Sequence, residues 1–208
     1  MSNSIDNIEL IKDLLNFEQE GDFYMLYVFK RKKDQPEGER DNHQSVRTIK
    51  TYCIDSIEYL EKRYDEIKQL CEMFKARAYI HIQKQNHKDV SLEMLTALAT
   101  KIKNGQHHQK HLFESVVGQI KTYEKRWIVD IDTKDEIVVH RIAHIVNIMK
   151  PEGDKIIKCI PTKSGYHLIT SRFDVMTFNK MMSLQGDVPD IQKKNPTLLY
   201  LPESLSDF

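Results

Sequence analysis

Residues 126–134 read Arg-Trp-Ile-Val-Asp-Ile-Asp-Thr-Lys, and this stretch decides how the rest of the chain is interpreted. The run from Trp127 to Ile131 is apolar except for Asp130, which is typical of a short buried strand. Because side chains alternate between the two faces of a strand, Asp130 and Asp132 share one face, with their Cβ atoms about 7 Å apart. Such a pair is costly to desolvate unless a cation compensates it. The stretch therefore indicates either a divalent-cation site or two solvated acids at the edge of a sheet.

The composition limits the classes of protein that fit. The 208 residues suffice for one large domain or two small ones, and 31 basic residues balance 31 acidic ones. A net charge of zero argues against a wholly basic nucleic-acid coat but allows a local basic groove. We expect no membrane partner, because no apolar run is long enough to span a bilayer and the N-terminus has no signal-peptide pattern. The three isolated cysteines, Cys53, Cys71 and Cys159, fit a reduced, cytoplasmic protein.

Strands and helices alternate regularly from residue 126 onward. The pattern predicts strands at 127–132, 155–160, 166–171 and 197–201, with helices at about 135–150 and 175–184. This order, β-α-β-β-α-β, is that of the ferredoxin-like or RRM-like fold. Before it, the sequence predicts strands at 23–29, 46–52 and 76–83 and helices at about 55–75 and 92–103. We therefore predict an α+β protein with an N-terminal α/β module in residues 1–125 and an RRM-like catalytic module in residues 126–208.

This predicted topology brings distant residues to one end of the C-terminal sheet. The third strand of the fold lies between the first and the second and runs antiparallel to both, so His167 should lie beside Asp130 and Asp132. The fourth strand flanks the first, so the loop before it, residues 187–195, should also reach the carboxylates. The side chains expected to converge are those of Asp130, Asp132, Ser164, His167, Asp190, Lys193 and Lys194.

These residue types suit phosphoryl transfer. Asp130 and Asp132 can hold Mg²⁺ or Mn²⁺, hard cations that often bridge to substrate phosphates. Ser164, Gly165 and the backbone of their turn can donate hydrogen bonds to a triphosphate, and His167 can donate or shuttle a proton. A lone strand histidine is more often structural, so its role depends on the carboxylate pair. The cations expected to neutralise phosphate charge are Lys163, Lys193 and Lys194.

Two further segments are candidates for contact with nucleic acid. Residues 101–126 carry six lysine and arginine residues, of which Lys121, Lys125 and Arg126 lead directly into the strand of the aspartates. Residues 76–83 alternate in polarity, so that the face with Arg77 could line a substrate groove. Each segment could equally be a solvated surface.

The segment Val129-Asp-Ile-Asp132, followed by Thr162-Lys-Ser-Gly-Tyr-His167, resembles the first two catalytic motifs of archaeo-eukaryotic primases, most of all those of small primase-like proteins of phages and mobile elements. Members of that family join an RRM-like catalytic module to an N-terminal α/β module and use divalent metal to join nucleotides. The resemblance covers residues 125–201. It implies metal binding by Asp130 and Asp132, and contact of Ser164 and His167 with nucleotide phosphates.

The third motif of that family, a hydrophobic residue followed by an acid, has no clean match in this sequence. Asp190 is the best candidate by topology for a further metal-binding acid. The weaker candidates are Asp174, Asp187 and Glu203. Without a third acid the second metal site would be weaker, and a binding protein without catalysis could remain.

We therefore expect a metal-dependent nucleotidyltransferase of DNA replication, of the primase or polymerase type, that adds nucleotides to a template-paired 3′-OH. Its partners would be a DNA template and ribo- or deoxyribonucleoside triphosphates. A separate helicase or replication protein would unwind the duplex, because the sequence contains no helicase P-loop. The alternatives are a non-catalytic RRM-like nucleic-acid-binding module derived from a primase fold, and another metal-dependent phosphodiesterase or cyclase. Carboxylates on the open sheet face disfavour the binding module, because they repel phosphate in the absence of metal.

Overall fold

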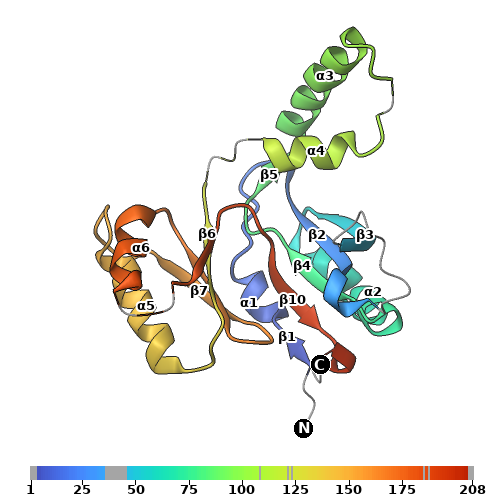
Figure 1. Cartoon of the computed structure of the whole chain (residues 1–208). Coiled ribbons are helices and arrows are strands. Elements are labelled where there is room, and N and C mark those ends of the chain that lie inside the picture. The colour runs from blue at the N-terminus through green and yellow to red at the C-terminus, as the bar shows by residue number, and fades with distance from the viewer. Residues whose placement is uncertain are drawn as a thin grey trace.

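The computed structural model describes residues 4–35, 46–107, 109–120, 122, 124–184, 186 and 188–205 of the chain. It contains helices and two antiparallel sheets, which confirms the predicted α+β class. In the part of the chain that it describes, no helix is long and apolar enough to cross a membrane. Figure 1 shows the larger sheet with α2 on one side of the molecule, the smaller sheet with α5 and α6 on the other, and α3 projecting from the body.

The larger sheet has six strands, with the order β1-β10-β4-β2-β3 and with β5 paired to β2 off this path. Its strands are β1 (Ile5–Asp6), β2 (Asp22–Arg31), β3 (Val46–Ile54), β4 (Arg77–Ile80), β5 (Gln85–Asn86) and β10 (Thr197–Leu201). All of these pairs are antiparallel. The accompanying helices are α1 (Ile8–Lys12), α2 (Ile57–Phe74), α3 (His87–Lys103) and α4 (Leu112–Gln119), and short 3-10 turns follow β2 (Lys32–Asp34) and β10 (Glu203–Leu205).

Local capping interactions set the starts of the two long helices. The Ser56 side chain accepts a hydrogen bond from the backbone N–H of Tyr59 at 3.1 Å, which satisfies one free donor of α2. The Asn86 side chain accepts from the N–H of Lys88 at 3.0 Å, and α3 therefore begins at His87, earlier than the predicted start at residue 92.

The smaller sheet has four strands in the order β7-β8-β6-β9, each antiparallel to its neighbours. Its strands are β6 (Trp127–Ile131), β7 (Ile156–Pro161), β8 (Tyr166–Thr170) and β9 (Asp190–Gln192), and its helices are α5 (Glu136–Ile148) and α6 (Val175–Ser183). Asp174 caps α6 by accepting from the N–H groups of Met176 and Thr177, at 3.0 and 3.1 Å. Asp174, which we considered from the sequence as a weak candidate for metal binding, therefore has a structural role as a helix cap.

The two faces of the smaller sheet pack against different partners. Val129 and Ile131 of β6 lie in a core with α5 and α6. Ile128 and Ile169 face the opposite way and lie in the core of the larger sheet and α2. The sheet is thus covered by helices on one face and by the larger sheet on the other, and Asp130 shares the face of Ile128 because residues two apart on a strand point the same way.

One predicted strand belongs to the other sheet. We expected residues 197–201 to flank β6, but β10 pairs with β1 and β4 of the larger sheet (Figure 1). All five residues of β10 are buried, which fits a strand that is covered on both faces. The position beside β6 is taken by β9, which has only three residues and so carries almost no periodic signal. After residue 192 the chain therefore returns from the predicted C-terminal module to the sheet of the N-terminal one.

Candidate active site

Asp130 lies in the middle of a row of polar side chains that crosses three strands. It stands opposite His167 in the pairing of β6 with β8, and opposite Asp190 in the pairing of β6 with β9. Residues directly opposite one another in an antiparallel pair project from the same face. The row therefore lies on the face that is directed at the larger sheet. The Nε2 atom of His167 is 3.5 Å from Oδ1 of Asp130.

The environment of Asp130 disfavours its negative charge. Burial raises the pKa of the Asp130 carboxyl, and the neighbouring charges of Asp132 and Asp190 raise it further. The amide of Gln192, which donates to Oδ2 of Asp130 at 3.0 Å, and the positive charge of Arg31 act in the opposite direction. Three acids thus crowd around one partly buried position, which is the arrangement that a bound cation would stabilise.

His167 is a neutral side chain that is held from both sides. Its Nδ1 atom lies 2.9 Å from the hydroxyl of Thr197, at the start of β10 in the other sheet. Burial lowers the pKa of His167 to about 4, although the charge of Asp132 acts in the opposite direction. When the Thr197 hydroxyl donates to Nδ1, the single imidazole proton is on Nε2, which faces Asp130. His167 can therefore donate a hydrogen bond on the carboxylate side without carrying a charge.

The turn between β7 and β8 brings Ser164 to the second aspartate. The Ser164 hydroxyl donates to Oδ1 of Asp132 at 2.9 Å. The turn is closed by the N–H of Thr162, which donates to the carbonyl of Gly165 at 2.8 Å. A Cβ atom added at Gly165 would lie 1.9 Å from the carbonyl oxygen of Ile131, so no larger residue fits there. The glycine lets the turn lie against the end of β6, and this contact places Ser164 at the acid pair.

Of the three lysines expected to contact nucleotide phosphates, two lie at the other end of β6, and the ammonium of the third is bonded to another segment. Gln192 stands opposite Ile128, so the residues after β9 lie at the far end of β6 from Asp130. Lys193 and Lys194 are at that end. Lys163 donates from Nζ to the carbonyl of Leu205 at 2.8 Å, so its ammonium is engaged by the C-terminal 3-10 turn.

Two of the arginines expected to meet nucleic acid are buried within the protein. Arg77, with its side chain 3% exposed, donates from Nε and Nη2 to both carboxylate oxygens of Asp34, at 2.9 and 2.8 Å. Arg126 donates to the carbonyl of Leu14 at 2.7 Å and is 7% exposed. Lys125 is exposed, and Lys121 lies outside the described residues. Of these four predicted contacts, the structure places Lys125 on the surface.

Sequence reasoning missed three residues that contact or influence the row. Gln192 carries a usable signal, because it lies two positions after Asp190 and so shares its face within one short strand. Thr197 and Arg31 come from the larger sheet. No local pattern identifies them, because they approach only when the two sheets pack together.

The donor set suits a cation that is shared with a substrate. Among the described residues, no group of three or more histidine, cysteine, aspartate and glutamate side chains is arranged to enclose a metal ion. Mg²⁺ is usually held by one or two carboxylates, with water and substrate phosphates as its other ligands. Asp130 and Asp132 fit that role, with Asp190 adjacent to the first of them.

Comparison of the chain with protein-family models, with curated proteins and with solved structures finds no match. The function has to be inferred from the site itself.

Proposed function

We propose that the protein is a metal-dependent nucleotidyltransferase of the primase or polymerase type, which adds nucleotides to a template-paired 3′-OH. The observation that carries this proposal is the row in which Asp130 stands between His167 and Asp190, with Asp132 two positions further along β6. The carboxylates can hold a divalent cation, and a neutral histidine on the same face and a turn with serine and glycine beside them can donate hydrogen bonds. Transfer of a nucleotide phosphate requires both kinds of group.

The arrangement of the smaller sheet supports the proposal. The elements run in the order β6-α5-β7-β8-α6-β9, and the strands lie in the order β7-β8-β6-β9. Both orders agree with the RRM-like module that the resemblance to archaeo-eukaryotic primases leads us to expect. The larger sheet with α2 agrees with an N-terminal α/β module, although its strand β10 comes from the end of the chain.

Asp130 and Asp132 are the residues that would hold Mg²⁺ or Mn²⁺, and Asp190 is the third acid within reach. The raised pKa of Asp130 supports this assignment, because a cation would relieve the repulsion that its acidic neighbours create. When bound, the cation would stabilise negative charge on the phosphoryl oxygens of the substrate.

The remaining side chains of the site would bind and orient the nucleotide. His167, held by Thr197, would donate its Nε2 proton to a phosphate oxygen. Ser164 would exchange its hydrogen bond with Asp132 for one to a phosphate oxygen, since its side chain is on the surface and its turn is already closed without it. Arg31, whose positive charge acts on Asp130 from the larger sheet, would add electrostatic stabilisation of a triphosphate.

Template-directed incorporation of labelled nucleotides tests the proposal. The wild type, the variant Asp130→Asn/Asp132→Asn and the control Glu152→Gln are compared with Mg²⁺ or Mn²⁺, with and without a primer. Glu152 is an exposed acid in the loop after α5, so its variant makes one acid-to-amide change of the same kind away from the site. We expect the double variant to lose activity by about a hundredfold or more, and the control to retain it. Absence of product from the wild type, together with metal-independent binding of single strands, would support the binding module instead.

A further inference from the structure

The end of the smaller sheet opposite the carboxylates is basic. Lys125 precedes β6, while Arg172 follows β8 and Lys193 follows β9, and all three side chains are exposed. Because β8 and β9 run antiparallel to β6, the start of β6 and the ends of the other two strands meet at the same edge. The acid that is closest in sequence, Glu124, is paired with Arg126 at 3.0 Å.

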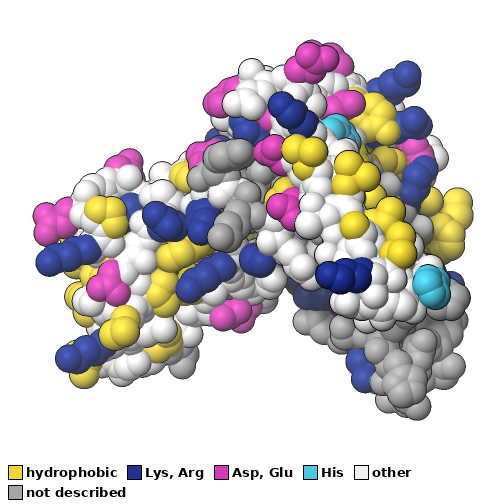
Figure 2. Space-filling model, turned by 90° about the horizontal axis from the view of Figure 1, so that it is seen from above, with side chains coloured by type: hydrophobic (Ala, Val, Ile, Leu, Met, Phe, Trp, Pro, Cys, Tyr) yellow, Lys and Arg dark blue, Asp and Glu magenta, His cyan; other side chains and the backbone are white. Residues whose placement is uncertain are grey.

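These cations line a pocket that also contains an aromatic ring. We call it the basic groove, and its lining includes Lys125, Trp127, Arg172, Lys193 and Lys194. The ammonium of Lys193 lies 5.0 Å from the centre of the Trp127 ring. Figure 2 shows Lys and Arg side chains gathered on the upper face, between the part of the molecule that holds α5 and α6 and the part that holds α3 and α4. A positive surface and a partly accessible indole are thus presented together.

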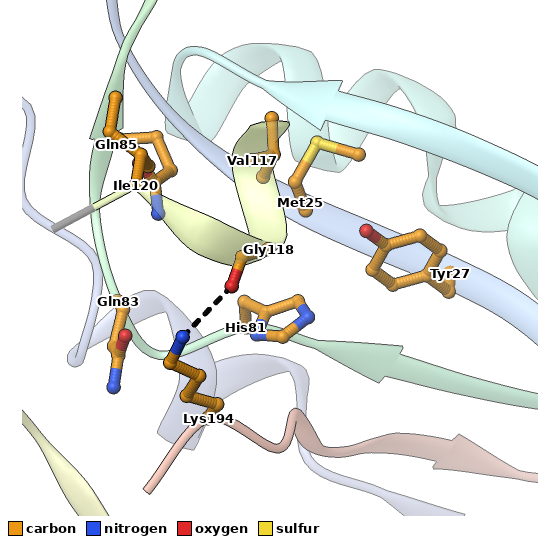
Figure 3. A pocket seen from close by; sticks show the side chains of 9 residues that line it. All are labelled: Met25, Tyr27, His81, Gln83, Gln85, Val117, Gly118, Ile120 and Lys194. Carbon is orange, nitrogen blue, oxygen red and sulfur yellow. Dashed lines mark hydrogen bonds between the residues drawn. The ribbon is translucent and has the colours of Figure 1, made fainter. Parts of the chain in front are cut away.

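Hydrogen bonds between distant segments hold the groove in shape. The side-chain amide of Gln83, after β4, donates to the carbonyl of Arg126 at 3.1 Å and also to that of Lys193. Lys194 donates to the carbonyl of Gly118 at the end of α4, at 3.1 Å (Figure 3). Three stretches of the chain that are far apart in sequence are therefore tied together around the groove before any ligand binds.

An adjoining pocket continues the groove toward aromatic side chains. It shares Gln83 and Lys194 with the basic groove and is lined further in by Tyr27 and His81, whose rings meet edge to face with centroids 5.6 Å apart (Figure 3). Burial lowers the pKa of His81 to about 4, so this inner part is uncharged near neutral pH. Positive charge at the mouth fits a ligand that carries phosphates, whereas the inner pocket beside the two rings is small, with a volume of about 40 Å³.

We propose that the basic groove binds single-stranded nucleic acid without metal, at a site separate from the carboxylate row. A base can stack on Trp127 only when it is unpaired, and its phosphate would then lie beside Lys193. The choice of nucleic acid as the ligand rests on the proposed function, because the template strand of such an enzyme must also pass over this sheet. Lys193 lies three residues along the chain from Asp190, which is a distance of about 10 Å in extended backbone. About three stacked nucleotides cover the same distance.

The test uses the intrinsic fluorescence of Trp127, which is the single tryptophan of the chain. A short oligothymidylate is titrated into the full-length protein in EDTA, with no nucleoside triphosphate present. We expect saturable quenching, because the base stacks on the reporter itself. Lys125→Glu, Arg172→Glu and Lys193→Glu should each weaken binding by about tenfold, and each should reduce the dependence of log affinity on log salt by about 0.7. Circular dichroism verifies that these surface variants fold.

The control is Lys180→Glu, which makes the same charge change at an exposed position on α6. The proposal is overturned if the wild type shows no quenching, if Lys180→Glu weakens binding as much as Lys193→Glu, or if a duplex of equal length competes as well as the single strand. Asp130→Asn/Asp132→Asn should bind the oligonucleotide with unchanged affinity. Inactivity in nucleotide incorporation with intact quenching would therefore count against the proposed function alone, and lost quenching with intact incorporation would count against the groove alone.

Discussion

Replacing Asp130 by asparagine should stabilise the protein in the absence of metal. The substitution keeps the size and the acceptor oxygen for Gln192 but removes a charge that burial, Asp132 and Asp190 all disfavour. Because the folded-state pKa of Asp130 is raised, the ionised carboxylate lowers the unfolding free energy of the wild type at a pH above that pKa. This loss of stability disappears as the pH falls through the pKa. The increase in unfolding free energy caused by Asp130→Asn should therefore be largest at neutral pH and smaller in acid.

The magnitude follows from the two repulsive pairs. Asp190 stands directly opposite Asp130, where Cβ atoms are about 5 Å apart, and Asp132 is two positions along the strand, at about 7 Å. The Asp130 side chain is 25% exposed, so solvent screens both pairs partly. With an effective dielectric constant of about 40, Coulomb's law gives about 1.7 kcal/mol for the pair about 5 Å apart and about 1.2 kcal/mol for the pair about 7 Å apart. Gln192 and Arg31 favour the charge and offset part of this repulsion, so we expect the unfolding free energy to rise by about 1–2 kcal/mol.

Urea unfolding followed by Trp127 fluorescence measures this difference in EDTA and again with Mg²⁺. A cation at ten times its Kd stabilises a protein that binds it in the folded state by about 1.4 kcal/mol, so Mg²⁺ should stabilise the wild type and leave Asp130→Asn almost unchanged. Glu152→Gln serves as the control, because its carboxyl is exposed and away from the row. A variant that is less stable than the wild type in EDTA would refute the reasoning, and so would equal stabilisation of both proteins by Mg²⁺.

Three further perturbations have defined outcomes. Gly165→Ala should destabilise the protein by about 3 kcal/mol or more in thermal unfolding, because the new Cβ would lie 1.9 Å from the carbonyl oxygen of Ile131, and a loss under about 1 kcal/mol would contradict the packing of the turn. The pKa of His167 is about 4 in the folded state against a usual 6.5, so the unfolding free energy should fall by up to about 3 kcal/mol as the pH drops from 6.5 to 4. Urea unfolding at a series of pH values measures this loss, which should be absent from His167→Gln. Arg77→Met should cost about 3 kcal/mol in urea unfolding, because the buried Asp34 carboxylate then keeps only its longer contact with Arg31, at 3.3 Å, and Arg77→Met/Asp34→Leu should recover most of that loss.

The position of the acid row could be anticipated from the order of elements along the chain. Once the smaller sheet has the connectivity β6-α5-β7-β8-α6-β9, the strand with His167 must lie beside the strand with Asp130. The approach of Asp190 followed from the same topology, although the expected carrier was a loop and the structure has β9 there. Strand alternation then decides that these side chains share a face.

Contacts between the two sheets could not be anticipated. The apolar run of β10 fits a buried strand in either sheet, and its pairing with β1 and β4 depends on side chains at the other end of the chain. For the same reason no sequence pattern indicates that Thr197 holds His167, or that Arg77 is buried with Asp34. Lys193 and Lys194 were assigned to the wrong end of the sheet because residues 187–195 were expected to form a loop. The structure has the short strand β9 there, and it carries the chain along β6 from Asp130 toward Trp127.

The central claim is that the carboxylate row binds a divalent cation together with a nucleotide. Electron paramagnetic resonance of Mn²⁺, titrated into the protein with and without a nucleoside triphosphate, measures this most directly. We predict that the wild type binds Mn²⁺ more tightly when the nucleotide is present, beyond the binding of Mn²⁺ by the nucleotide alone, and that Asp130→Asn/Asp132→Asn abolishes this gain. Equal Mn²⁺ binding by the wild type and the double variant would contradict the claim.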